Sequence, residues 1–210
     1  PFSISRHQPG RIEITVKRLG PVSSRIADLR EGDSLGVRGP YGRGFSEEPS
    51  CCFVAGGVGL AAVAPLIERY PDAPVLYGER SVGERLYTDR FEHVRFFTDD
   101  GTSGLKGFPT DALPEVLRDT RPAMVYACGP EVMLSKVASI CREADVRCEI
   151  SLERYMKCAM GVCGQCSMDG KRVCVDGPEF RGEELANATD FGFRGLDKAG
   201  RWVSLSGAGD

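Results

Sequence analysis

The sequence predicts a multi-domain protein of the α/β plus β class, and three observations lead to this prediction. Residues 1–48 contain short alternating segments that are typical of antiparallel strands. Residues 49–150 alternate short apolar runs with helical stretches, a pattern typical of a buried parallel sheet. Residues 151–210 carry a glycine- and cysteine-rich loop. These three ranges are the domains that the sequence predicts.

The first segment, residues 1–48, predicts part of an antiparallel barrel. Strands are expected at Phe2–Ser5, Arg11–Lys17 and Ser34–Arg38, with one short helix at Arg25–Arg30 capped by Ser23 or its neighbour Ser24. Such pieces occur in barrels that bind flavin, where a helix N-terminus offers N–H groups to a pyrophosphate. Taken alone, this segment fits a small β-domain with a turn helix better than a flavin barrel.

The middle segment, residues 49–150, predicts a doubly wound sheet with a ligand beyond the carboxyl ends of its strands. The expected strands are Cys51–Ala55, Pro74–Tyr77, Val94–Thr98, Met124–Cys128 and Arg147–Ser151. The expected helices are Leu60–Tyr70, Val82–Phe91, Thr110–Asp119 and Pro130–Ala144.

Two turns at these strand ends are candidate dinucleotide-binding residues. The first follows the first strand and contains Gly56, Gly57, Val58 and Gly59. It is shorter than the full glycine fingerprint, and a plain tight turn is the alternative. The second follows the fourth strand and contains Cys128, Gly129 and Pro130. Cys128 would point to where a nicotinamide lies, although a small core residue is an equally good interpretation.

The choice between NAD and NADP depends on the residues after the second strand. Glu79 lies where an acidic side chain would meet the adenosine ribose, which favours NAD. Arg80 and Arg85 lie close by and would suit a 2′-phosphate. NAD is the preferred interpretation.

The cysteine-rich loop predicts a metal centre. Cys158, Cys163, Cys166 and Cys174 follow the spacing C-x4-C-x2-C-x7-C, the plant-type arrangement for a [2Fe–2S] cluster. Gly161 and Gly164 would let the backbone approach the cluster and direct N–H groups at sulfur.

Three other uses of cysteine compete with an iron–sulfur cluster. Structural zinc usually takes two close pairs of ligands, unlike this crowded loop. A disulfide framework is disfavoured by the odd total of nine cysteines. Core packing suits the cysteines in apolar segments, which are Cys51, Cys52, Cys141 and Cys148.

Composition excludes several classes of function. A net charge of −3 argues against a nucleic-acid partner that depends on bulk electrostatics. No apolar run has the length of a membrane span. His7 and His93 lie in ordinary polar contexts, and no catalytic side chain is expected.

The order of the motifs resembles a known family. Pro-Phe-Ser-Ile-Ser, Gly-Pro-Tyr-Gly, Ala-Gly-Gly-Val-Gly, Tyr-Ala-Cys-Gly-Pro-Glu-Val-Met, Cys-Ala-Met-Gly-Val-Cys-Gly-Gln-Cys and Val-Cys-Val-Asp-Gly-Pro-Glu-Phe follow one another along the chain. This order resembles the iron–sulfur flavoprotein electron-transfer subunit of type B dihydroorotate dehydrogenase, within the ferredoxin-reductase-like superfamily. The resemblance covers essentially the whole chain.

The resemblance implies an electron relay in pyrimidine biosynthesis. FAD would lie on the barrel, NAD on the α/β domain and the [2Fe–2S] cluster in the C-terminal domain. The implied partner is an FMN-containing catalytic subunit that oxidises dihydroorotate, in a cytoplasmic heterotetramer. Matched by position, the flavin residues are Pro1, Phe2, Ser3, Thr15, Val16, Lys17, Val22 and Ser23.

One departure from the family concerns the start of the chain. The family has an Arg directly before the residue that matches Pro1, and several barrel strands before that Arg. The expectation is therefore that the natural chain extends upstream of Pro1, or that this part of the barrel is supplied by another molecule or absent.

Three alternative functions are compatible with the sequence. A related flavin and iron–sulfur subunit of a hydrogenase, glutamate synthase-like or transhydrogenase complex would share the cluster motif. A redox sensor without nucleotide binding and a flavin-free structural subunit are two further alternatives.

Overall fold

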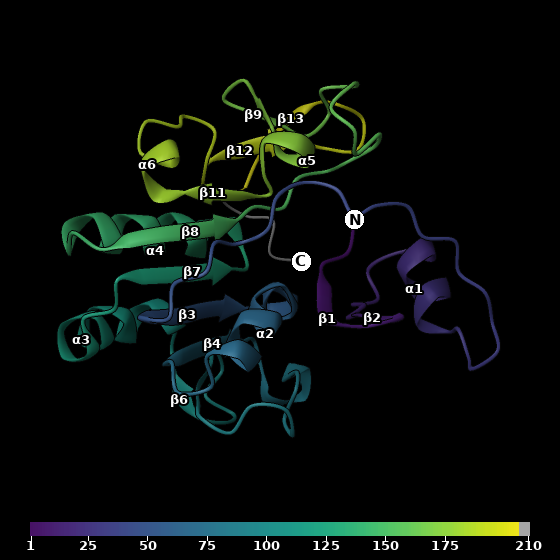
Figure 1. Ribbon diagram of the computed structural model, residues 1–210. Coiled ribbons are helices and arrows are strands. Elements are labelled where there is room, and N and C mark those ends of the chain that lie inside the picture. Colours follow the sequence, from purple (N-terminus) through teal and green to yellow (C-terminus); the bar gives the residue numbers. More distant parts are fainter. Residues whose placement is uncertain (206–210) are drawn as a thin grey trace.

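A seven-stranded sheet organises the chain in the computed structural model, which describes residues 1–205 (Figure 1). Six strands run parallel, and the edge strand β11 runs antiparallel to β8. In spatial order the strands are β11 (Glu179–Arg181), β8 (Arg147–Ser151), β7 (Met124–Cys128), β3 (Cys51–Gly56), β4 (Val75–Glu79), β5 (Val94–Thr98) and β6 (Leu105–Lys106).

The direction of chain progression reverses between β3 and β7. From β3 the chain adds β4, β5 and β6 on one side, and it then returns to add β7 and β8 on the other side. The carboxyl ends of β3, β7 and β8 point toward the N-terminal hairpin (Figure 1). In parallel sheets, ligands bind at such a reversal point, beyond the carboxyl ends of the strands.

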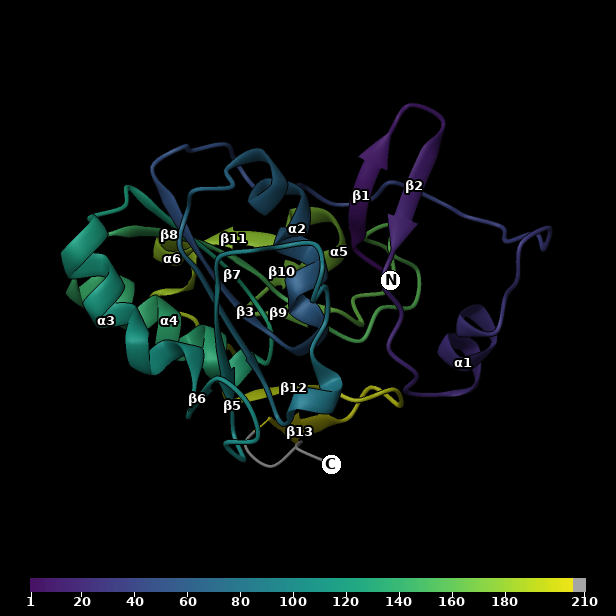
Figure 2. The same ribbon diagram turned by 90° about the horizontal axis from the view of Figure 1, so that it is seen from below.

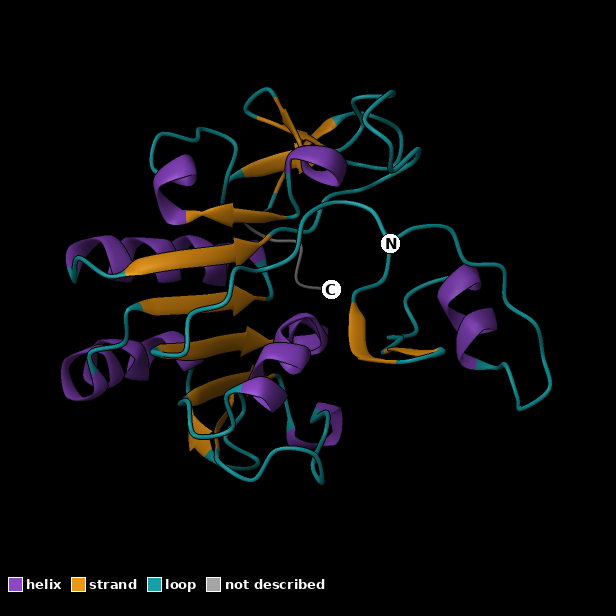
Figure 3. Cartoon of the chain, in the orientation of Figure 1, coloured by secondary structure: helices purple, strands orange, loops and turns teal. Residues whose placement is uncertain are grey.

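Helices cover both faces of the sheet, as expected for a doubly wound layer (Figure 3). Helices α3 (Pro109–Thr120) and α4 (Glu131–Glu143) pack on the face that presents Val54, and α2 (Leu60–Arg69) packs on the face that presents Phe53. These neighbours on β3 point to opposite faces because strand side chains alternate. Both are fully buried, so β3 is apolar throughout.

The predicted strands of the middle segment are confirmed. Three have the expected limits, and β3 and β4 differ by at most two residues at either end. The helices α2, α3 and α4 are confirmed to within one residue at each end. The short edge strands β6 and β11 were not predicted, because two or three residues carry no detectable alternation.

The predicted helix at Val82–Phe91 is wrong. Only a 3-10 turn, η2 (Val82–Glu84), forms there. Tyr87 has a φ of 54°, which ends any helix. The Leu86 N–H donates to the Tyr77 hydroxyl at 3.1 Å, and the apolar side chains of the segment pack against the α2 face of the sheet. Tertiary packing therefore overrides the local helical pattern.

The N-terminal segment, residues 1–48, contains one hairpin and one helix. Strands β1 (Ile4–Gln8) and β2 (Arg11–Ile14) pair antiparallel, and they lie beside α2 (Figure 2). The second strand ends three residues earlier than expected, and the strand expected at Ser34–Arg38 is irregular. A strand without a paired neighbour leaves its backbone N–H and C=O groups without hydrogen bonds to another strand. Residues 15–17 and Ser34–Arg38 therefore do not form strands here.

The short helix also differs from the prediction. Helix α1 spans Pro21–Ala27 and follows Gly20, so neither Ser23 nor Ser24 is its N-cap. Pro21 at the first helical position explains the earlier start. The Ser23 hydroxyl instead accepts the N–H groups of Leu19 at 2.9 Å and Gly20 at 3.0 Å.

The C-terminal region, which begins after β8, is built from short elements and joins the main sheet through β11. Its other elements are β9 (Ser167–Met168), β10 (Lys171–Arg172), α5 (Val173–Asp176), α6 (Gly182–Leu185), β12 (Arg194–Leu196) and β13 (Trp202–Ser204). Phe180 of β11 is fully buried in the core under α4. Within residues 1–205, no helix is long and apolar enough to cross a membrane.

A buried ion pair fixes this region to the sheet domain. Arg154, just after β8, forms a two-pronged ion pair with Glu131 at the start of α4, one prong at 2.7 Å. The two side chains are only 4% and 9% exposed. Glu131 also accepts the N–H of Gly192 at 2.7 Å, and Arg154 donates to the Arg194 carbonyl at 3.3 Å. The pair therefore connects three segments of the chain.

We expect Arg154→Ala to lower the free energy of unfolding by about 3–5 kcal/mol, because Glu131 would keep a buried charge without its partner. Urea denaturation of the single variant and of the Arg154→Ala/Glu131→Gln double variant measures this effect, and the double variant should recover part of the loss. Arg95→Ala is the matched control, since its pair with Glu115 is exposed and should contribute less than about 1 kcal/mol. Equal losses in Arg154→Ala and Arg95→Ala would contradict the role of burial.

Candidate functional site

The four predicted cluster ligands lie on two neighbouring segments. Cys158, Cys163 and Cys166 belong to the irregular loop between β8 and β9, and Cys174 lies in the one-turn helix α5. Cys166 and Cys174 are buried, whereas Cys163 is exposed and Cys158 is half-buried. The loop therefore places Cys166 and Cys174 in the core and Cys163 at the surface.

The thiols are arranged as two neighbouring pairs. Cys163 lies close enough to Cys158 to affect the pKa of its thiol, and Cys166 affects the pKa of Cys174 in the same way. Cys158 is also close enough to Cys174 for their charges to interact. In the part of the chain that the structure describes, no three His, Cys, Asp or Glu side chains converge as a single-ion site requires. Two pairs match the chemistry of a two-iron cluster, in which each iron takes two thiolates.

Backbone N–H groups point at the sulfurs, as predicted for a cluster loop. The Gly161 N–H donates to Cys174 Sγ at 3.3 Å, and the Cys163 N–H donates to Cys158 Sγ at 3.5 Å. The Cys163, Met160 and Val162 amides lower the pKa of the Cys158 thiol to about 6. Burial raises the pKa of Cys174, and its contact with Cys166 acts in the same direction. The donor set suits thiolate ligands and hence an iron–sulfur cluster.

Two arginines hold the loop in place. Arg38, from the N-terminal half, donates to the Cys158 carbonyl at 2.8 Å, and Arg172 donates to the Gly161 carbonyl at 2.8 Å. Gly161 has a φ of 77°, and a Cβ there would lie 3.1 Å from Val175. The close approach between this loop and α5 therefore requires glycine at this position.

The two predicted nucleotide turns lie against each other. Ala55 and Cys128 are register partners at the carboxyl ends of β3 and β7, so η1 (Gly57–Gly59) and the Cys128–Pro130 turn leave the sheet side by side. A Cβ on Gly59 would lie 2.4 Å from the Cys128 carbonyl oxygen. The structure thus brings both sets of predicted residues to the point where the strand order reverses.

An acidic side chain lies beside the first turn. Glu79 ends β4, is 7% exposed, and accepts a hydrogen bond from the Tyr77 hydroxyl at 2.6 Å. A Cβ on Gly57 would come within 3.9 Å of Glu79 Oε2. Burial raises the pKa of Glu79, although its bond to Tyr77 and the nearby Lys17 act in the opposite direction.

Cys128 is half-buried and differs from the core cysteines. Burial raises the pKa of its thiol to about 12, and a hydrogen bond with Ser151 opposes the shift. The predictions that Cys51, Cys52, Cys141 and Cys148 are buried core residues are confirmed.

Six of the eight predicted flavin residues lie at one end of the hairpin, and the other two, Val22 and Ser23, lie in α1. Because Ile4 pairs with Ile14, Pro1–Ser3 and Thr15–Lys17 leave the hairpin at the same end. Thr15 bonds to the Tyr87 hydroxyl, and Lys17 pairs with Glu84 at 2.9 Å. Val22 is 70% exposed in α1, and Phe2 is 42% exposed. Exposed apolar and polar groups together fit a ligand with an aromatic ring and a polar tail.

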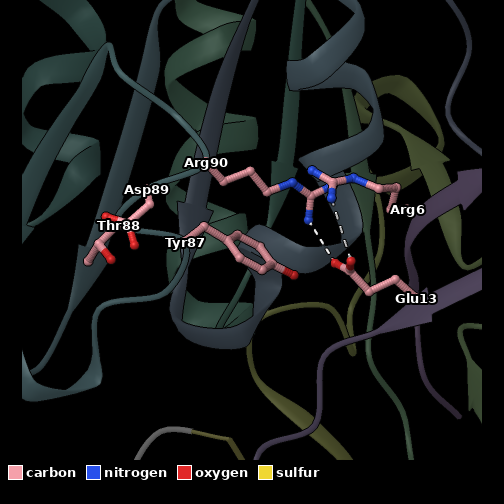
Figure 4. A pocket seen from close by; sticks show the side chains of 6 residues that line it. All are labelled: Arg6, Glu13, Tyr87, Thr88, Asp89 and Arg90. Atoms are coloured by element: carbon pink, nitrogen blue, oxygen red, sulfur yellow. Dashed lines mark hydrogen bonds and ion pairs between the residues drawn. The ribbon is translucent and has the colours of Figure 1, made fainter.

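A surface pocket of about 500 Å³ marks the joint between the hairpin and the sheet domain (Figure 4). It is lined by Arg6, Glu13, Tyr87, Thr88, Asp89 and Arg90. Arg90, whose side chain is 9% exposed, bonds to Glu13 at 3.1 Å, to Glu68 of α2 at 2.9 Å and to the Ser5 carbonyl at 2.6 Å. Arg6 and Arg90 both pair with Glu13, so the pocket marks where the hairpin is attached to the sheet domain.

Sequence reasoning missed the residues that orient the site. Arg38 and Arg90 lie in segments without a motif, Arg172 lies in the insert before Cys174, and their partners are 120, 77 and 11 positions away along the chain. No local pattern in the sequence could have identified contacts over such separations.

Comparison with known proteins agrees with the geometry of the loop. Residues 153–186 match the family described as the iron–sulfur cluster binding domain of dihydroorotate dehydrogenase B. Among solved structures, the chain resembles the NADH-dependent reduced ferredoxin–NADP oxidoreductase, studied for flavin-based electron bifurcation. The TM-score is 0.75 and the identity 31%, over 88% of this chain and 72% of the other.

Curated relatives match nearly the whole chain. The probable dihydroorotate dehydrogenase B (NAD(+)) electron transfer subunit of Methanocaldococcus jannaschii is 38% identical over 97% of this chain and 81% of the relative. The corresponding subunit of Methanopyrus kandleri is 42% identical over 96% and 80%. That of Pyrococcus horikoshii is 44% identical over 85% and 73%. The chain therefore belongs to the family of dihydroorotate dehydrogenase B electron transfer subunits.

Proposed function

We propose that this chain relays electrons between NAD(H) and a partner dihydroorotate dehydrogenase subunit in pyrimidine biosynthesis. The observation that carries the proposal is the convergence of three predicted sites on one region. The nucleotide turns lie at the carboxyl edge of the sheet, this edge points toward the hairpin, and Arg38 ties the N-terminal half to the cluster loop. Cofactors held at these places would be neighbours.

The proposal assigns each cofactor to a segment of the chain. Residues 1–48 would hold FAD, residues 49–150 NAD, and residues 151–210 a [2Fe–2S] cluster, the last five of these residues lying outside the described part. FAD, when bound, would exchange a hydride with nicotinamide and pass electrons singly to the cluster. The chain's contribution is to place the nicotinamide beside Cys128, the flavin ring beside Pro1–Ser3 and Thr15–Lys17, and the pyrophosphate beside Val22 and Ser23.

NAD rather than NADP is the proposed nucleotide. Glu79 is held by Tyr77 next to the glycine turn, where a carboxylate would accept hydrogen bonds from the adenosine ribose and repel a 2′-phosphate. The relatives named above carry NAD(+) in their names, which agrees with this assignment.

The proposed partner is an FMN-containing dihydroorotate dehydrogenase subunit, in a heterotetramer. Cys163 is exposed, so electrons could leave the cluster at the surface of the chain. We place the complex in the cytoplasm, because the five cysteines outside the cluster motif are free thiols and a reducing compartment keeps thiols in that form.

If the cofactors work in series, NADH alone should reduce the cluster. We expect an electron paramagnetic resonance signal of a reduced [2Fe–2S] cluster after NADH is added to anaerobically purified protein. Dithionite serves as the control, because it reduces a cluster directly. A signal with dithionite and none with NADH would show that the link through the flavin is broken.

The cluster should be needed for delivery to the partner and not for the oxidation of NADH. We expect Cys163→Ser and Cys166→Ser to abolish electron delivery to the partner subunit, while NADH oxidation by a direct dye acceptor largely survives. Cys163 is exposed, so its substitution tests ligation without a packing defect. Cys51→Ala changes a buried cysteine outside the motif and should leave both rates close to the wild-type values. Equal loss of both activities in the ligand variants would contradict the order of the relay.

The close contact at Gly59 predicts weaker nucleotide binding when a side chain is added. The Gly59→Ala methyl group would lie 2.4 Å from the Cys128 carbonyl oxygen and push the two turns apart. We expect the dissociation constant for NADH, measured by calorimetry, to rise about tenfold, the equivalent of about 1.4 kcal/mol. Gly83→Ala is the matched control, because a Cβ there meets open space. Unchanged affinity in Gly59→Ala would place the nucleotide elsewhere.

A further inference from the structure

A row of polar side chains crosses the sheet beside the nucleotide turns. Cys128 of β7 pairs in register with Ser151 of β8, and Ser151 pairs in register with Glu179 of β11. Register partners point to the same face of a sheet. Their neighbours Ala127, Ile150 and Phe180 lie in the core under α3 and α4, so the row points to the opposite face.

The three side chains lie next to one another in this row. The Ser151 hydroxyl donates to Glu179 Oε1 at 3.2 Å, and Cys128 stands beside Ser151 as its register partner. Ser151 is 6% exposed. The row therefore begins at the residue proposed to lie by the nicotinamide and ends at a carboxyl group.

The other carboxyl oxygen of Glu179 has no partner. Oε2 is buried and makes no hydrogen bond in the part of the chain that the structure describes. A buried acceptor left unsatisfied costs more free energy when it carries charge, so this environment favours the protonated form. Glu149, two residues before Ser151 on β8, is also buried, but it accepts the Ser46 N–H at 2.8 Å. Glu149 is thus satisfied, and Glu179 is not.

The charged groups facing Glu179 come from two elements. Glu149 of β8 disfavours a negative charge on Glu179, and Arg43, from the segment that crosses to β3, favours one. The Cys128 thiol on β7 is neutral at physiological pH, because burial raises its pKa to about 12. Burial, together with Glu149, raises the pKa of Glu179 to about 7. The group can therefore gain and lose a proton near neutral pH.

The relay reaction leaves a proton that the cluster cannot carry. Each NADH gives up a hydride, which is one proton and two electrons. Two one-electron transfers through an iron–sulfur cluster remove the electrons only, so one proton must leave through the protein. We propose that Glu179 accepts this proton by way of Ser151 and passes it to solvent. Ser151 gives its hydroxyl proton to Glu179 Oε1 and takes the thiol proton of Cys128, and the thiol in turn takes up the proton that would be released at the flavin, so neither side chain is left charged.

This inference rests on the proposed function. Glu179 receives the proton through Ser151 and, in that sense, is a positioning residue. The Glu in Asp-Gly-Pro-Glu-Phe thus gains a role that is separate from the neighbouring ligand Cys174. The carboxyl group of Glu179 lies near the surface, because Glu179 is half-buried and the nearby Arg43 is exposed.

The first test measures the ionisation of Glu179 without any turnover. We expect isotope-edited infrared spectra of the cofactor-loaded protein to show a buried carboxyl band that is lost as the pH rises through about 7. The band should be missing in Glu179→Gln and retained in Glu149→Gln. A wild-type protein without such a band, or a band that persists in Glu179→Gln, would overturn the inference.

The second test follows the rate at which NADH reduces the cluster, as a function of pH. The wild-type rate should fall as the pH drops through about 7, because protonated Glu179 accepts nothing. At pH 8, we expect Glu179→Gln and Ser151→Ala to be slower by about 10²-fold and to lose this acid limb. Glu179→Asp should recover part of the rate. A role in folding alone would instead lower the rate equally at every pH.

Glu149→Gln is the matched control for the rate measurement. It should stay fast, with its acid limb moved to lower pH, since a negative neighbour of Glu179 is removed. If Glu179→Gln keeps both the wild-type rate and the acid limb, the proton route is wrong and the electron relay stands. If NADH fails to reduce the cluster in the wild-type protein, the relay itself is wrong, and the proton route fails with it.

Discussion

The parallel pairing of β3 with β7 is the constraint on which the rest of the structure depends. These strands are far apart in the sequence, and their pairing creates the point where the strand order reverses. Two βα turns leave the sheet there, and Gly59 lets them touch. The topology alone makes this edge the expected place for a ligand, because ligands of parallel sheets bind beyond the carboxyl ends of the strands at such a reversal point.

The N-terminal segment, residues 1–48, is joined to the sheet domain by polar contacts as well as by Phe45, which packs against its core. Arg90 bonds to the hairpin and to α2, Lys17 pairs with Glu84, and Arg38 reaches the cluster loop. Such pairs fix an orientation between surfaces while leaving apolar groups such as Phe2 and Val22 exposed. In an electron relay this arrangement is useful, because cofactors must lie close together while their binding surfaces stay open.

The cluster region depends on the sheet in a different way. Strand β11 extends the sheet by pairing with β8, and the buried pair of Arg154 and Glu131 ties the start of the loop to α4. Strand β11, which anchors this region, also places Glu179 at the end of the polar row on β7 and β8. The element that positions the metal ligands therefore also completes the proposed proton route, so electrons and protons would leave along separate paths.

The sequence by itself determined the elements whose signal is local. Alternation of apolar strands and amphipathic helices predicted the sheet domain nearly to the residue, and cysteine spacing predicted the loop that the structure folds into two thiol pairs. Only the tertiary structure decided where long-range contacts override local preference. It replaced the helix expected at Val82–Phe91 with an irregular segment, and it left Ser34–Arg38 without a strand partner. The Cys128–Ser151–Glu179 row also depends on strand register, which no spacing along the chain records.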